Sequence, residues 1–150
     1  MGGSTCMVLA WKEPRISVVV GLIGAVDFWY DVTKTPPGKT QDAKRSALSL
    51  RVRQLVNSLD PQGRKAAIAP KAVLLANGAR DDGIAIASIK KFVEDLRPSY
   101  KAHPDRLHLL EEPKTGHEVT ERMWEEGTQW LLRHLVERPL RAPALGPRKR

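Results

Sequence analysis

Two polar loops in the second half of the chain carry residue types that suit acid–base chemistry. Asp81 and Asp82 follow an apolar run at residues 72–78, and His117 follows a shorter apolar run at residues 107–110. Both runs are typical of buried strands, and the carboxyl ends of parallel strands meet at one edge of a sheet. A carboxylate that accepts a hydrogen bond from histidine Nδ1 fixes the tautomer of the imidazole and stabilises the imidazolium. The pattern therefore predicts a paired acid and histidine that could act in general acid–base catalysis.

Simpler interpretations of these residues stay open. Asp81 and Asp82 beside Gly83 could form an ordinary solvated turn, or cap the helix that follows. His117, taken alone, would more often be a surface loop residue. The remaining histidines have no such partner, and no pair of histidines has the spacing and carboxylate context of a metal site; they are His103, His108 and His134. The sequence therefore indicates neither a metal nor another cofactor.

Alternating strands and helices must position the two loops. Apolar, β-branched runs predict strands at residues 16–24, 72–78 and 107–110. Apolar stripes at helical spacing predict helices at residues 4–11, 48–59, 89–96 and 119–137. This order predicts an α/β fold in which a parallel sheet of about three strands is flanked by helices.

The two loops together resemble those of the α/β-hydrolase superfamily, most closely its esterase and prolyl-oligopeptidase-like serine hydrolases. The acid loop of that family reads His-Gly-x-x-Asp-x-x-Val-Pro, and residues 77–85 match its spacing with the acid at Asp81. Asn77 stands where histidine is common, and Ile84-Ala85 where Val-Pro is common. Gly116-His117 ahead of a helix is similar to the histidine loop of the family. The resemblance covers about residues 1–136 and implies that Asp81 and His117 are two members of a catalytic triad.

The nucleophile that this resemblance implies is not found as a motif. The family carries its serine on a Gly-x-Ser-x-Gly elbow, and no such motif occurs in the sequence. The opening Met1-Gly2-Gly3 is similar to the end of the variant Gly-x-Ser-Met-Gly-Gly, with Met1 directly after the serine. We therefore expect the C-terminal half of a hydrolase, in which the Met1 backbone N–H is an oxyanion-hole donor. Ser4 and Cys6 are poor substitutes, because one lies within the next helix and the other has no basic neighbour.

The function that the resemblance implies is that of a serine hydrolase acting on carboxylic esters, inactive in this chain alone. The alternative is a non-catalytic α/β interaction module or a truncated gene product. Phe28 and Trp29 follow the first predicted strand, so they could line the substrate pocket or pack in a core or lid. A small-molecule ester or acyl substrate is the expected partner, and an exposed edge of the strand at residues 16–24 could mediate oligomers.

Charge and composition exclude other classes of protein. The 150 residues carry a formal charge of +8, which divides into +6 over residues 31–71, +5 over residues 138–150, and −3 over residues 72–137. Because the excess avoids the predicted hydrolase body, we expect no nucleic-acid partner. No apolar run approaches the roughly 20 residues that span a membrane, and the single Cys6 excludes an internal disulfide. We expect hydrolase residues 1–137 with an insert or lid at 31–71, a basic disordered tail at 138–150, and a cytoplasmic location.

Overall fold

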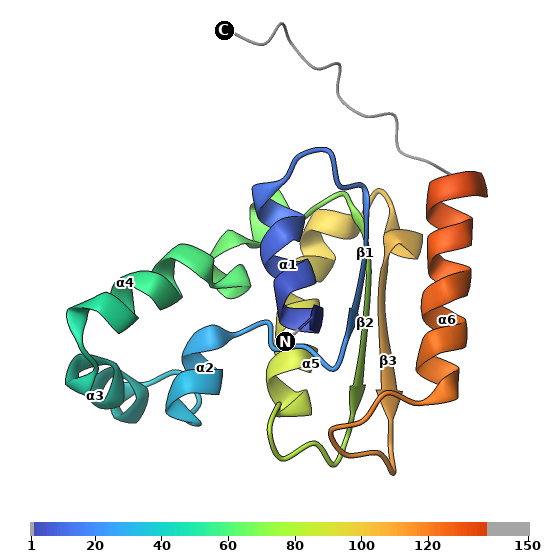
Figure 1. Ribbon diagram of the computed structural model, residues 1–150. Coiled ribbons are helices and arrows are strands. Elements are labelled where there is room, and N and C mark those ends of the chain that lie inside the picture. Colours follow the sequence, from blue (N-terminus) through green and yellow to red (C-terminus); the bar gives the residue numbers. More distant parts are fainter. Residues whose placement is uncertain (1, 138–150) are drawn as a thin grey trace, which may run out of the picture.

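A parallel three-stranded sheet forms the centre of the computed structural model, which describes residues 2–137 (Figure 1). Its strands are β1 (Val18–Leu22), β2 (Ala72–Gly78) and β3 (Leu107–Glu112), in the order β1-β2-β3. Val18 lies opposite Ala72 in the first pair of strands, and Val73 lies opposite Leu107 in the second. The predicted α/β class with a parallel sheet is confirmed.

Helices cover both faces of this sheet. They are α1 (Gly2–Lys12), α2 (Phe28–Thr33), α3 (Lys39–Ala47), α4 (Leu50–Leu59), α5 (Ile86–Leu96) and α6 (Glu121–Leu131). Short 3₁₀ segments are η1 (Pro61–Ala67), η2 (Arg97–Tyr100) and η3 (Pro104–Arg106), and a π-helical segment, η4 (Leu132–Glu137), continues α6. Helices α1 and α5 lie on one face of the sheet and α6 on the other, while α2, α3 and α4 project to one side (Figure 1).

The core divides into two layers because the side chains of β2 alternate between the two faces of the sheet. Val73 and Leu75 pack with Met7 of α1 and Phe92 of α5, whereas Leu74 packs with the residues around α6. All seven residues of β2 are buried. The middle strand therefore fixes both layers, and its C-terminal end is held firmly where the acid loop begins.

Several predicted boundaries change at helix caps and strand ends. β1 is shorter than the predicted run at 16–24, whereas β3 extends beyond 107–110 to Glu112. Helix α4 begins after Ser49 and α6 after Thr120, because each of these side chains accepts a hydrogen bond from a backbone N–H of the first turn. The helix predicted at 119–137 thus becomes α6 and η4, and those at 4–11 and 89–96 extend to 2–12 and 86–96.

The segment at residues 31–71 contains more helix than the sequence pattern predicted. Helix α2 begins after Asp27, whose side chain accepts from Tyr30 N, and it has only six residues. Helix α3 is rich in charged residues and has only Gln41 buried. Neither helix carries a long apolar stripe, so hydrophobic periodicity could not find them.

Two predictions lie outside the described residues: the basic tail at residues 138–150, and the role of Met1. Within residues 2–137, none of the helices combines the length and the apolar character that crossing a membrane requires.

Candidate active site

The acid loop begins where β2 ends and folds back on the side chain of Asp81. Asp81 Oδ1 accepts hydrogen bonds from the backbone N–H groups of Gly83 and Ile84, both at 2.8 Å. The Asp81 side chain is fully buried. An ionised carboxylate is an acceptor only, so two N–H donors on one oxygen hold it in a fixed orientation. The loop is therefore a turn, but not a solvated one, because its backbone N–H groups orient the buried carboxylate of Asp81.

The histidine loop follows β3 and lies directly against the acid loop. Ala79 N donates to Glu112 O at 2.9 Å, and Arg80 N donates to Thr115 O at 3.0 Å. Gly78 allows this close approach, since a Cβ atom there would lie 2.3 Å from the carbonyl oxygens of both Thr115 and Gly116. The backbones of the two loops therefore form one unit, although 36 positions separate Asp81 from His117.

The structure brings Asp81 and His117 together. His117 Nδ1 lies 2.9 Å from Asp81 Oδ2, the oxygen that the backbone does not use. The His117 side chain is 55% exposed, whereas that of Asp81 is buried. One ring nitrogen is therefore held by a buried acceptor while the ring remains accessible. This is the geometry in which an acid orients a histidine that exchanges protons with a substrate or nucleophile.

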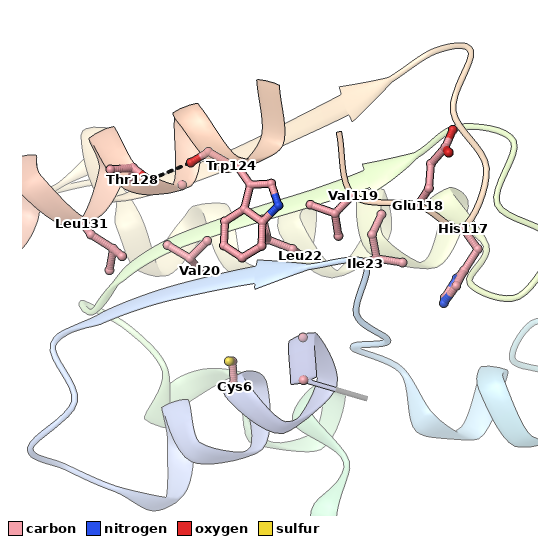
Figure 2. Close-up of a pocket in the computed structure, with 13 residues that line it drawn as sticks. Cys6, Val20, Leu22, Ile23, His117, Glu118, Val119, Trp124, Thr128 and Leu131 are labelled. Carbon is pink, nitrogen blue, oxygen red and sulfur yellow. Dashed lines mark hydrogen bonds between the residues drawn. The ribbon is translucent and has the colours of Figure 1, made fainter. Parts of the chain in front are cut away.

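His117 also lines a largely apolar pocket of about 550 Å³. Its walls come from α1, from β1 and the residue after it, from the histidine loop, and from α6. Figure 2 shows His117 at one end of this pocket, with Val20, Leu22 and Trp124 further along it and Cys6 opposite. Gly2 and Gly3 of α1 line it as well. The His117 side chain thus has an adjoining space for an apolar group.

The beginning of α1 packs closely on the chain that follows β1. A Cβ atom on Gly3 would lie 2.3 Å from Leu22 O, and one on Gly24 would lie 2.4 Å from Gly3 C. Ser4 Oγ accepts a hydrogen bond from Ala25 N at 2.9 Å. Ser4 therefore fixes α1 to this loop and does not line the pocket beside His117, whereas Cys6 does line it.

The two aromatic residues predicted to line a pocket lie away from His117. Phe28 borders a separate hollow between α1, α2 and α4. Trp29 is buried, donates from Nε1 to Asn57 Oδ1 at 3.0 Å, and has the Arg45 guanidinium 4.0 Å from its ring centroid. Neither of them lines the pocket that His117 lines.

Asp60, which the sequence analysis did not single out, joins α2 to the end of α4. Its Oδ1 accepts from Phe28 N at 3.0 Å and from Gln62 N at 3.3 Å. Burial raises the pKa of this carboxyl group, and the two backbone donors oppose that shift. Asp60 is therefore a structural acid that fixes where α2 starts.

Lys34 is a second residue that the sequence analysis missed. Its ammonium group donates to Gly83 O in the acid loop at 2.7 Å and to Asp31 Oδ1 at 2.7 Å. A lysine in a basic segment carries no signal for a contact 49 positions away. No motif could have found it.

The described residues contain no candidate metal site. Over residues 2–137, no three His, Cys, Asp or Glu side chains are grouped so that they could hold a metal ion. The arrangement at the strand ends is instead one acid, one histidine and an adjoining apolar pocket.

Comparison with known proteins identifies the fold. TT1662 from Thermus thermophilus has 22% sequence identity and a TM-score of 0.64, over 86% of this chain and 49% of its own. A carbohydrate esterase family 15 glucuronoyl esterase from Caldicellulosiruptor kristjansonii has 18% identity and a TM-score of 0.59, over 87% of this chain and 40% of its own. This is an α/β-hydrolase-like fold. The chain spans less than half the length of either structure, and neither a protein-family profile nor a curated protein matches its sequence.

Proposed function

We propose that this chain supplies the acid and the base of an α/β-hydrolase-type serine hydrolase that acts on carboxylic esters. The observation that carries the proposal is the 2.9 Å contact between His117 Nδ1 and Asp81 Oδ2. Buried Asp81 holds one ring nitrogen of a histidine that faces an apolar pocket. A surface turn with a chance neighbour has no need of a buried, fully hydrogen-bonded carboxylate.

In this reaction His117 takes the proton of the serine hydroxyl as the serine attacks the ester carbonyl, and then gives that proton to the leaving alcohol. Asp81 keeps the proton on Nδ1, so that Nε2 is free to accept, and it stabilises the imidazolium. The nucleophile is expected immediately ahead of α1, because Gly2 and Gly3 line the pocket together with His117. The Met1 backbone N–H would then be one donor to the oxyanion.

The apolar pocket suggests which part of the substrate lies beside the base. Val20, Leu22 and Trp124 offer hydrocarbon surface and no charge. An apolar acyl or alcohol group gains free energy when it leaves water for such a surface. The proposal therefore favours esters with a small apolar group on one side of the scissile bond.

The test starts from the coding sequence upstream of Met1. We expect an in-frame Gly-x-Ser there, and we expect the longer protein to hydrolyse p-nitrophenyl butyrate and to react with a fluorophosphonate. The 150-residue chain should do neither. In the longer protein, Asp81→Asn should lower kcat by about 10⁴-fold, the order seen when a triad acid is replaced by an amide.

Exposed His103 provides the matched control for His117. His117→Ala should abolish the activity of the longer protein, and His103→Ala should leave it unchanged. Robust fluorophosphonate labelling of the 150-residue chain, or equal activity of the two histidine variants, would contradict the proposal.

A second candidate function, a non-catalytic interaction module, is favoured by one observation. β1 pairs with β2 on one side, and no other strand in residues 2–137 pairs with it. A strand edge of this kind can bind another extended segment. This candidate expects no in-frame serine upstream and a stable complex with a partner.

A further inference from the structure

Lys34 occupies an unusual backbone conformation at the end of α2. Its φ of 49° and ψ of 39° lie in the left-handed region, where glycine is the common residue at the end of a helix. Only one other described non-glycine residue, Ile23, has a positive φ. A residue other than glycine is uncommon in this conformation and carries a backbone cost that its side-chain contacts can offset.

The contacts of the Lys34 side chain connect it to the acid loop. Its ammonium group donates to the carbonyl oxygen of Gly83 at 2.7 Å. The N–H group of the same peptide unit belongs to Ile84, and it donates to Asp81 Oδ1 at 2.8 Å. Asp81 Oδ2 in turn contacts His117 Nδ1 at 2.9 Å. One continuous chain of hydrogen bonds thus runs from Lys34 to His117.

We propose that Lys34 is a positioning residue for the Asp81–His117 pair, acting through the Gly83–Ile84 peptide. A cation on the carbonyl oxygen polarises that peptide and strengthens the hydrogen bond that its N–H makes, since bonds in a chain reinforce one another. It also fixes the orientation of the peptide plane, and with it the Asp81 carboxylate. The role as an aid to catalysis rests on the proposed function, whereas the positioning itself rests on the contacts.

The close packing around Gly83 leaves its peptide little room to change orientation. A Cβ atom at Gly83 would lie 3.3 Å from Asp81 Oδ1 and 3.6 Å from His117 Nδ1. The Gly83 backbone therefore lies against both members of the pair, and a rotation of its peptide would move a donor away from the carboxylate. Asp31 holds the Lys34 ammonium group from the other side at 2.7 Å.

Lys44, which lies in the next helix, α3, provides a matched control. Its ammonium group also donates to a backbone carbonyl, that of Thr33, at 2.9 Å, and to Thr35 Oγ1. Neither partner belongs to the acid loop. Lys44→Met therefore removes a similar charge and a similar hydrogen bond beside Lys34, but no hydrogen bond of the chain that leads to Asp81.

The experiment measures the proton NMR resonance of the His117 Nδ1–H group in the 150-residue chain, with its solvent exchange rate. In Lys34→Met we expect an upfield shift and exchange at least tenfold faster, and faster exchange of the Ile84 amide. Lys34→Arg should restore both signals, because a guanidinium group can donate to the same carbonyl. Lys44→Met should leave both signals unchanged.

Lys34→Gly separates positioning from stability. Glycine suits the left-handed conformation, so the urea midpoint should stay equal or rise. The Nδ1–H resonance should nevertheless shift upfield and exchange faster, as in Lys34→Met. Unchanged signals in Lys34→Met and Lys34→Gly, or equal changes in Lys44→Met, would overturn the inference. Asp81→Asn distinguishes this failure from that of the proposed function: if it leaves the resonance intact, the pair itself is wrong.

Discussion

The carboxyl edge of the sheet and the unpaired edge of β1 differ in whether their polar groups have hydrogen-bond partners. At the carboxyl edge, both oxygens of Asp81 have partners, and the two loops are joined by backbone hydrogen bonds. β1 pairs with no strand in residues 2–137 on the edge away from β2, and its residues Val20 and Leu22 line the apolar pocket. These polar groups of the first region are hydrogen-bonded within the described residues, whereas the outer edge of β1 has no strand partner there.

The Asp81–His117 pair and the pocket beside it therefore depend on different parts of the chain. The geometry of Asp81 and His117 depends on β2, β3, the loops after them and, in our inference, Lys34, all of which lie within the described residues. The pocket beside them depends on β1 and on side chains such as Trp124, which is 63% exposed. We therefore expect the pair to form in this chain even if no ester is hydrolysed.

The largest effect is expected at Gly78, which allows the two loops to meet. In Gly78→Ala, the new Cβ would lie 2.3 Å from the carbonyl oxygens of Thr115 and Gly116, so the loops must separate. We expect the free energy of unfolding to fall by about 3 kcal/mol, the upper part of the usual range for one substitution. The His117 Nδ1–H resonance should also be lost. Urea unfolding and proton NMR measure the two effects.

Gly63 provides the control for this change. A Cβ atom there meets nothing within 4 Å, so Gly63→Ala should preserve both the stability and the resonance. A Gly78→Ala variant that matched the parent in both measurements would show that the loops do not depend on their close contact. The carboxyl edge would then be less tightly organised than the comparison with β1 requires.

The sequence pattern was sufficient where local signals and topology agree. Buried strands followed by polar loops predicted that Asp81 and His117 would meet, and the structure brings them together. The apolar stripes of α5 and α6 likewise predicted those helices, since amphipathic periodicity is a local property.

The pattern failed where long-range contacts decide the structure. Helices α2 and α3 are short, and caps and contacts with neighbouring elements fix them, as Asp27 and Asp60 do for α2. Lys34 was one of nine basic residues in the segment 31–71, and only the fold places it on Gly83 O. The resemblance to a hydrolase led us to expect an exposed edge on β1, but the pocket beside this strand could not be predicted from the sequence.

The second candidate function, an interaction module, predicts an intermediate effect along β1, where the unpaired strand edge would bind a second copy of the chain. Trp124 is 63% exposed and lines the pocket, and exposed tryptophans often dominate binding energies. Trp124→Lys should weaken self-association at least tenfold, or about 1.4 kcal/mol, without lowering stability. Sedimentation equilibrium measures it. Because Cys6 also lines this pocket and is the only cysteine, its maleimide labelling should slow as concentration rises, but not in Trp124→Lys.

Leu50→Lys is the matched control for association. Leu50 is 62% exposed on α4 and does not line the pocket. Equal weakening by both variants would mean that general surface hydrophobicity causes association. A monomer at all concentrations, with a sharp cooperative thermal transition, would mean that β1 needs no partner, and the contrast between the two regions would disappear.

The smallest effect concerns the ion pairs of Asp95, near the C-terminal end of the helix that follows the acid loop. Asp95 on α5 accepts from Lys65 Nζ at 2.7 Å and from Lys91 Nζ at 2.9 Å, and these hydrogen bonds lower its pKa to about 2. A lowered pKa means that the folded state favours the ionised form, so the stabilisation is present above the ordinary value near 4. It is lost as the pH falls from about 4 to about 2.

Because these charges are partly exposed, screening reduces the stabilisation to about 1 kcal/mol. Asp95→Asn should therefore lose about 1 kcal/mol at pH 7 in urea unfolding, and its stability should depend less on pH between about 4 and 2. Asp42→Asn is the control, since Asp42 is exposed and its Arg45 partner lies 3.9 Å away. A larger loss in Asp42→Asn would show that the charged helices beside the sheet, and not α5, carry the acid sensitivity.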